Sequence, residues 1–581
     1  MQLAAFLQRY QFPLAAVLIF TAAFVFFVQN LGIHGLEYRD DEIFYFKSAG
    51  EMIRDHNWLS PTYYGENRFQ KPILFYWLVI LSTLASHAGW VSARLVSVFF
   101  AALTVTLTWI LARLMFRWRV AALSCLILAT FPMFFRHAKN VVPDMTLNFF
   151  IVAALLAGWL LIRQPQRRMW PLIFFAACAL GFMVKGFAAI VVPFVTMIVF
   201  VLTRKRWDVL RRLNSPAGLV LMALIILPWF IYMGAVHGGE YFDFMLRQET
   251  RNRLINPEQP RLAAQVLQNA KTNAVFYAGV LATHFSPWSL FILPAGFIIF
   301  RGIRRRPEAR DGLAFLAIWL AVVLTFFVFI FFHINHYLLV LSTPLAIALA
   351  YFFSECRLEQ IAIARRSWKG VFIFLFMIGL LSLSLVFVYL AGLSFVWLVV
   401  YGLAAGAMMV MTARSADPVL PPALLGLFLV FVLFQSQVIS RSGLCPHTVY
   451  RDLARSIAAS DEGDVAITVA SHSLHEKELQ VYFDQKITKT GHGYEPLTRS
   501  NLLKFLQTHD QAFFIITAAD YERYADDLKD FSLKEITRED ITRKSYALDK
   551  DFLKALFRLD RSGIRAYIMQ PILLMRKDHY G

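Results

Sequence analysis

Long apolar runs, each about as long as a bilayer-crossing helix, follow one another along most of this chain. Such a helix needs about 20 predominantly apolar residues, and the 581-residue sequence is 58% hydrophobic and only 17% charged. Thirteen segments of this kind are predicted, at residues 12–31, 93–116, 119–135, 144–163, 169–184, 186–203, 217–235, 276–300, 313–332, 336–354, 370–391, 393–412 and 418–440. The fold class predicted for residues 1–440 is therefore an all-α polytopic membrane domain.

The basic residues gather in short loops between these segments. A net charge of +18 could indicate nucleic-acid binding, but cations spread over many loops do not form one basic face, so no nucleic-acid partner is expected. The arginine-rich loops all fall on the side of the N-terminus, at residues 113–119, 163–168, 204–212, 301–310 and 357–369. By the positive-inside rule, this side is predicted to be cytoplasmic.

One more apolar stretch, residues 73–88, would reverse this alternation if it crossed the membrane. We therefore expect it to lie in the membrane interface. The first segment lacks a small-residue cleavage site and is expected to be a retained anchor. The alternation places residues 32–92, 136–143, 237–275 and the chain after 441 on the outer side.

The final part of the chain, residues 441–581, differs in character. Short β-rich runs at 465–470, 479–483 and 512–517 alternate with helical stretches such as 501–507. This pattern is typical of a small α/β domain, which we expect outside the membrane. The four cysteines are scattered and form neither a disulfide framework nor a metal-binding pattern.

A cluster of acidic residues, Asp40, Asp41 and Glu42, follows the first apolar segment. A carboxylate at the centre of a bilayer costs about 2.5–3.5 kcal/mol or more, so acids at a membrane edge are candidates for function. The alternative is a solvated N-cap of the helix that continues through Met52. A second outer-side acid, Asp144, opens another apolar segment and taken alone is also more typical of a cap. Two acidic sites at the outer ends of different helices favour a shared pocket.

Basic residues on the outer side are candidates for binding phosphate. Lys71 directly precedes the interfacial stretch, where an ammonium can bind a lipid phosphate; a snorkelling lysine is the alternative. Lys185 lies between two predicted spans on the outer side, against the positive-inside trend. The arginines of residues 247–253 would attract anionic lipid or pyrophosphate-like groups.

Metal and nucleotide sites are not predicted. His333 and His336 have a spacing that could place two imidazoles together, but no acids accompany them in the sequence. A divalent ion is possible but not required. No Gly-rich nucleotide-binding loop is present.

These motifs, in this order, resemble those of the polyprenyl-phosphate-sugar-dependent glycosyltransferases of the GT-C fold. The branch is that of the bacterial aminoarabinose:lipid A transferases and, more distantly, the protein O-mannosyltransferases. The resemblance covers about residues 10–350 and rests on Asp41-Glu42 with Tyr45, Lys71-Pro72 with Tyr76-Trp77, Ala93-Arg94-Leu95, Pro143-Asp144, Lys185-Gly186, Leu227-Pro228-Trp229, residues 247–253 and Pro287-Trp288.

The resemblance implies roles for individual residues. Asp41 would be the catalytic carboxylate and Asp144 a second catalytic acid. The donor phosphate would be bound by Lys71, Lys185, Arg247 and Arg251. Contacts with the substrates are expected from Glu42, Tyr45, Tyr76, Arg253 and His336.

The resemblance also implies a setting and partners. The protein would be a monomer in the bacterial inner membrane, with a cytoplasmic N-terminus and a periplasmic C-terminal domain. Its donor would be a sugar on undecaprenyl phosphate, and its acceptor lipid A, another envelope glycan or a protein. The chain carries Phe44 where the family often has a polar residue and Gln70 where it frequently has an acid, which bears on the identity of sugar and acceptor.

Two other classes of protein are alternatives. A lipid or polysaccharide transporter should have helices broken by Gly or Pro at matching positions of two halves, with charges near mid-membrane. Here the acids and unusual lysines gather at the predicted outer edge. A membrane scaffold would lack the ordered series of motifs.

Overall fold

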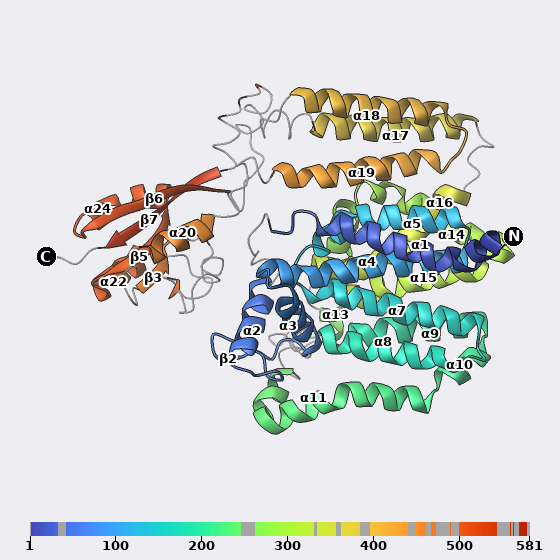
Figure 1. The fold of residues 1–581 in the computed structure, drawn as a ribbon, viewed down its shortest axis with the longest axis horizontal. Helices are drawn as coiled ribbons and strands as arrows, with labels where there is room; N and C mark the ends of the chain where they lie inside the picture. The colour runs from blue at the N-terminus through green and yellow to red at the C-terminus, as the bar shows by residue number, and fades with distance from the viewer. Residues whose placement is uncertain are drawn as a thin grey trace. The chain divides into compact units, whose positions relative to one another are not determined.

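A computed structural model describes most of the chain (Figure 1). The described residues are 2–32, 42–245, 262–329, 334–355, 362–383, 395–439, 449–459, 466–471, 474, 488–489, 499–542, 558, 560, 562 and 569–577. By internal contacts the chain divides into two compact units. One comprises Met1–Gln29, Ser48–Ile378 and Ala405–Leu433, and the other Asn30–Lys47, Gly379–Ala404 and Phe434–Gly581.

In the part of the chain that the structure describes, each predicted apolar segment overlaps one or more helices. The long helices are α1 (Gln2–Val28), α4 (Trp90–Met115), α5 (Trp118–Thr130), α7 (Pro143–Arg163), α8 (Met169–Lys185), α9 (Ala188–Arg204), α11 (Pro216–Asp243), α13 (Leu262–His284), α14 (Ile292–Arg305), α15 (Pro307–Val328), α16 (Ser342–Glu355), α17 (Ala362–Leu383), α18 (Phe395–Arg414) and α19 (Leu420–Ile439). Shorter elements are α2 (Glu42–Arg54), α3 (Leu74–Ser86), α6 (Pro132–His137), α10 (Trp207–Leu213), the 3₁₀ helices η3 (Trp288–Phe291) and η4 (Asn335–Leu341), and the strands β1 (Thr62–Tyr63) and β2 (Glu66–Asn67).

Five helical segments of the described chain are long and apolar enough to cross a membrane: Trp90–Met115, Pro143–Arg163, Pro216–Asp243, Pro307–Val328 and Asn335–Ser354. A sixth is obtained if the bent pair Ala270–His284 and Trp288–Arg305 counts as one span. Several other apolar helices are shorter than 18 residues, among them α8 and α9 with 17 residues each. The architecture is thus a multi-pass helical membrane fold, while the number thirteen stays a prediction.

Two predicted spans are wrong in detail, and proline explains both. The span predicted at 276–300 bends by 115° where α13 gives way to η3 and α14. Pro287 lies at this bend, and proline supplies no backbone N–H and clashes with the preceding helical turn. The span predicted at 119–135 breaks between α5 and α6 at Phe131, whose backbone is extended (φ −65°, ψ 123°). Pro132 follows it, and the residue before a proline avoids the helical region.

Close helix packing fixes the part of the first unit that matters for function. Helix α7 contacts α4, α8 and α9, as the neighbouring ribbons in Figure 1 illustrate. At Gly181 of α8 an added Cβ would lie 2.7 Å from Cβ of Ala189 and 3.0 Å from Cβ of Phe150. Only glycine allows α8 to approach its neighbours this closely. Lys185 lies one helical turn beyond Gly181, so this packing also fixes the position of its backbone.

The second unit contains a five-stranded mixed sheet in the order β4-β3-β5-β7-β6. Its strands are β3 (Ala466–Val469), β4 (Thr488–Lys489), β5 (Ala512–Thr517), β6 (Leu533–Thr542) and β7 (Met569–Lys577). Strand β5 pairs in parallel with β3 and antiparallel with β7. The strand predictions at 465–470 and 512–517 are confirmed as β3 and β5, and the run at 479–483 lies outside the described residues.

Side chains of β5 point alternately to the two faces of the sheet, and each face packs against a helix. Phe513 and Ile515 pack with α20 (Val449–Ala458), whereas Phe514 and Ile516 pack with α22 (Arg499–Thr508). Successive side chains of a strand point to opposite faces, so β5 is buried from both sides. The sheet and its two helices therefore form a layered core of their own.

Candidate active site

A cavity of about 390 Å³ opens within the first unit, between α7, α8, α15, η4 and the segment that precedes α3. Most of its wall is apolar, and the polar groups are few. The polar lining residues are Gln70, Asp144, Lys185, His336 and Tyr337. The apolar ones are Pro72, Leu147, Phe182, Gly186, Phe187, Ala188, Val191, Met245, Phe326, Phe327, Leu339 and Val340.

An ion pair between Asp144 and Lys185 lies at the polar end of this cavity. Helices α7 and α8 are joined by a short loop and pack together, so the start of α7 lies beside the end of α8. Lys185 Nζ is 2.6 Å from Asp144 Oδ1, and the two side chains are only 12% and 8% exposed. Asp144 is not a helix cap, because the N-cap of α7 is Val142. The cap interpretation of Asp144 is therefore wrong, and its carboxylate instead holds the ammonium of Lys185.

Residues of η4 complete the polar end. His336 Nε2 lies 3.9 Å from Asp144 Oδ1, and Lys185 Nζ lies 5.9 Å from the centre of the Tyr337 ring, in the range of a cation–π contact. Behind them, the His137 ring is centred 5.8 Å from that of His336. His137 Nδ1 donates to the Met133 carbonyl oxygen at 2.8 Å. His137 was not predicted from the sequence, although it belongs to the basic turn just before Asp144.

The segment that carries Lys71 forms another part of the wall. Lys71 Nζ donates to the backbone oxygen of Gln70 at 2.8 Å, and its side chain is buried beside the cavity-lining Gln70 and Pro72. Arg68 Nε donates to the hydroxyl of Tyr76 at 3.1 Å. Tyr76 is fully buried in α3, so this hydrogen bond ties the segment to that helix.

Comparison with known proteins gives consistent results. Residues 14–242 match the family profile described as dolichyl-phosphate-mannose-protein mannosyltransferase. Over 388 residues the chain is 29% identical to the undecaprenyl phosphate-alpha-4-amino-4-deoxy-L-arabinose arabinosyl transferase of Pseudomonas paraeruginosa, covering 66% of this chain and 65% of that protein. It is 30% identical over 313 residues to a transferase of the same description from Pseudomonas fluorescens, covering 52% of each.

Among solved structures, the crystal structure of ArnT from Cupriavidus metallidurans bound to undecaprenyl phosphate superposes with a TM-score of 0.67. The alignment covers 96% of this chain and 97% of that one at 20% identity. The chain is thus similar in sequence to bacterial aminoarabinosyl transferases and shares the fold of ArnT. The resemblance inferred from its motifs is confirmed. The matches to the two Pseudomonas proteins leave a third or more of each relative uncovered.

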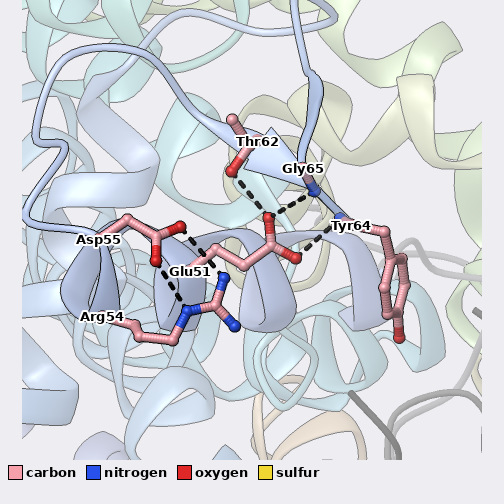
Figure 2. A network of polar contacts seen from close by, with 6 residues as sticks. All are labelled: Glu51, Arg54, Asp55, Thr62, Tyr64 and Gly65. Atoms are coloured by element: carbon pink, nitrogen blue, oxygen red, sulfur yellow. Dashed lines mark hydrogen bonds and ion pairs between the residues drawn. The ribbon is translucent and has the colours of Figure 1, made fainter. Parts of the chain in front are cut away.

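A buried carboxylate that was not predicted from the sequence organises the hairpin leading to Lys71. Figure 2 shows Glu51 of α2 accepting hydrogen bonds from Thr62 Oγ1 at 2.7 Å, the Tyr64 backbone N–H at 2.7 Å and the Gly65 backbone N–H at 3.3 Å. Tyr64 and Gly65 both have positive φ, 53° and 74°. Glu51 thus secures the tight turn between β1 and β2, four residues before Arg68.

The other predicted site residues are distributed as follows. Glu42 and Tyr45 are buried in α2. The site predictions for Asp41, Arg247, Arg251 and Arg253, and the metal interpretation of His333, lie outside the described residues. Within the described part of the chain, no group of three or more His, Cys, Asp or Glu side chains is arranged to hold a metal ion.

The geometry of this cavity suits an amphiphilic ligand. Its apolar walls can cover a hydrocarbon chain, since ligand pockets are mostly apolar with a few placed polar groups. Its polar end offers an ammonium, which binds phosphate through charge-assisted hydrogen bonds. Because Asp144 fixes that ammonium at rest, little rearrangement is needed when an anion arrives.

Proposed function

We propose that this protein is an inverting glycosyltransferase that moves a sugar from undecaprenyl phosphate to an acceptor on the periplasmic side. The acceptor is lipid A or another envelope glycolipid. The observation that carries the proposal is the apolar cavity with Lys185 and Asp144 at its polar end. It is supported by relatives named as undecaprenyl phosphate-aminoarabinose arabinosyl transferases and by a similar structure described as bound to undecaprenyl phosphate.

In the proposed reaction, an oxygen of the acceptor, belonging to a hydroxyl or to a phosphate group, attacks the anomeric carbon of the sugar. The bond between that carbon and the phosphate oxygen breaks, and undecaprenyl phosphate leaves with the electron pair. Asp41 takes the hydroxyl proton as general base, or orients the acceptor where the acceptor is itself a phosphate that carries no such proton. Direct displacement gives inversion at the anomeric carbon.

Cations stabilise the charge on the leaving phosphate in this scheme. Lys71, Lys185, Arg247 and Arg251 would bind that phosphate. Asp144 would act through Lys185 by fixing its position. Glu42, Tyr45, Tyr76, Arg253 and His336 would bind or support the sugar and the acceptor. No metal is required, since these cations can neutralise the phosphate; a divalent ion beside the phosphate is a variant of the proposal.

The proposed topology has thirteen spans in the bacterial inner membrane, with residues 1–440 as the transmembrane domain and 441–581 as a periplasmic α/β domain. The N-terminus and the arginine-rich loops face the cytoplasm, and the protein acts as a monomer. Large apolar side chains exposed on the described helices support contact with lipid; on α11 they include Leu224, Leu227 and Ile231. Helix α8 begins at Met169, next to the arginine-rich loop 163–168 that is expected in the cytoplasm, and it ends at Lys185. The position of Lys185 at the far end of the helix supports an active site on the outer side.

A second acceptor class follows from the family match. The profile that matches residues 14–242 is described as a protein mannosyltransferase, so a periplasmic protein is the alternative acceptor. The donor side of the proposal is the same for both.

The proposal is tested with purified full-length protein in lipid vesicles that contain undecaprenyl-phosphate-aminoarabinose and lipid A. We expect mass spectrometry to show lipid A heavier by one pentosamine, and no change with the Asp41→Asn variant. Lipid A from a deletion strain should lack the same group. Transfer to proteins in place of lipid A would support the alternative acceptor. Transfer to neither acceptor would contradict the proposal.

A further inference from the structure

Gln70 lines the same cavity as the ion pair, and the oxygen of its side-chain amide has no hydrogen-bond partner in the described structure. It lines the cavity together with Pro72. Its side-chain oxygen, Oε1, is buried and has no hydrogen-bond partner among the described residues. A buried acceptor without a partner is costly, so native proteins rarely keep one without a ligand or water to satisfy it.

The backbone around Gln70 is held on both sides. Lys71 Nζ binds the Gln70 backbone oxygen at 2.8 Å. The Phe69 ring packs against His237 and Tyr241, with centroids 5.1 and 5.4 Å away. The backbone N–H of Arg68 donates to the Pro61 oxygen at 2.9 Å. The amide is therefore presented to the cavity by a fixed segment, as a group that selects among ligands should be.

The chemistry of the amide limits which part of a ligand it can meet. The amide oxygen Oε1 only accepts hydrogen bonds, as do the oxygens of an ionised phosphate, so a phosphate cannot satisfy Oε1. A hydrocarbon chain offers nothing to either atom of the amide. Hydroxyl and amine groups carry the hydrogens that Oε1 lacks. In a sugar linked to a lipid phosphate, those groups belong to the sugar.

We propose that Gln70 is a sugar-binding residue of the donor site, whose neutral amide accepts a hydrogen bond from a hydroxyl or amine of the transferred sugar. This inference rests on the proposed function. It separates two roles among the cavity residues: the cations bind the phosphate, and the amide of Gln70 recognises the sugar. Gln70 then contributes to sugar selection, where Lys185 does not distinguish one sugar from another.

The test compares two lipid probes, undecaprenyl phosphate and undecaprenyl-phosphate-aminoarabinose, on the full chain in nanodiscs. The measured quantity is the ratio of the two dissociation constants, which cancels any general loss of folded protein. In Gln70→Leu we expect the preference for the glycosylated lipid to fall by about 10- to 100-fold, while undecaprenyl phosphate binds as before. Gln70→Glu keeps an acceptor in place and should retain most of the preference.

Lys185→Met is the matched control, because it should weaken both lipids alike and leave the ratio unchanged. An unchanged ratio in Gln70→Leu, or an equal loss for both lipids, would overturn the assignment of Gln70 while leaving the proposed function intact. Failure of the wild-type protein to bind either lipid would overturn the proposed function and this inference together. A wild-type ratio near one would overturn the recognition of this sugar by Gln70.

Discussion

The ammonium of Lys185 lies 2.6 Å from the carboxylate of Asp144, although 41 residues separate them in the chain. The pair joins the last turn of α8 to the first turn of α7. A carboxylate is favoured at a helix N-terminus and an ammonium at a C-terminus by the helix dipoles. Both charges are nearly buried, so each depends on the other for its stability.

We expect single substitutions of this pair to be much more harmful than the double substitution. Asp144→Asn or Lys185→Met leaves one buried charge unpaired, at a cost of about 3–5 kcal/mol in the free energy of unfolding. The double variant removes both charges and should recover most of that loss. Thermal unfolding in detergent measures all three. If the double variant loses as much stability as the two single variants together, the pairing is contradicted.

An exposed ion pair serves as the control for this experiment. Arg119 Nη1 lies 3.2 Å from Asp417 Oδ2, with side chains 51% and 43% exposed. Exposed pairs contribute about 0–1 kcal/mol, so Arg119→Met should barely change the melting temperature.

Substitution of Glu51 should disorder the hairpin and reduce activity without touching the cavity. Glu51→Ala leaves the Thr62 hydroxyl and two backbone N–H groups, all only partly buried, without their acceptor, and the loss should stay below the cost of about 1–3 kcal/mol for each fully buried group left unpaired. Because the hairpin leads directly to Arg68 and Lys71, we expect a lower melting temperature and weaker binding of undecaprenyl phosphate.

The neighbouring pair on α2 provides the comparison for Glu51. Arg54 donates to Asp55 at 2.7 Å on the surface, and this hydrogen bond lowers the pKa of the Asp55 carboxyl. Asp55→Ala should leave melting and lipid binding as in the wild-type protein. If Glu51→Ala behaves like Asp55→Ala, the hairpin does not depend on Glu51.

Lys139 should make stability depend on pH in the alkaline range. Its Nζ donates to the Gln29 backbone oxygen, and burial, together with the charge of Arg94, lowers the pKa of Lys139 to about 7. An unfolded lysine has a pKa of about 10.4. Between these two values the unfolded chain binds more protons than the folded protein at this residue. The contribution of Lys139 to the free energy of unfolding therefore rises with pH across this window, and it does not change with pH below 7.

Lys139→Gln should reduce the increase of stability with pH between pH 7 and about 10. Melting temperatures at a series of pH values from 7 to about 10 measure the slope, and the exposed Lys205→Gln is the matched control that should keep the wild-type slope. A wild-type slope in Lys139→Gln would contradict the lowered pKa.

Labelling of single cysteines tests the proposed orientation. In a cysteine-free background, His87→Cys should react with a membrane-impermeant thiol reagent added outside cells whose outer membrane has been permeabilised. Arg167→Cys, in a loop predicted to be cytoplasmic, should react only after the inner membrane is opened. Both residues are exposed in the structure. The opposite pattern would place the active site on the cytoplasmic side.

The sequence predicts the helices well because apolar runs are a local signal. It also predicts that Asp144 and Lys185 lie on the same side of the membrane, because successive spans cross in opposite directions and the start of one span is therefore level with the end of the next. The bend at Pro287 and the break at Phe131 were missed because a window of hydropathy averages over single prolines.

The contacts inside the site depend on three-dimensional packing and could not be predicted. Nothing in the sequence around Glu51 reveals that it receives three hydrogen bonds from a hairpin. Gln70 was noted only as a departure from the family pattern, and its unpaired oxygen becomes visible only when its neighbours are known. The cap interpretation of Asp144 failed because it considered α7 without its partner α8.

The most direct test of the account is an experimental structure of the full-length protein with undecaprenyl phosphate. We predict density for the phosphate at the polar end of the cavity, within hydrogen-bond distance of Lys185 Nζ, and density for the prenyl chain along the apolar wall that includes Phe182 and Phe187. A phosphate bound elsewhere, with the cavity between α7, α8 and η4 left empty, would contradict the account.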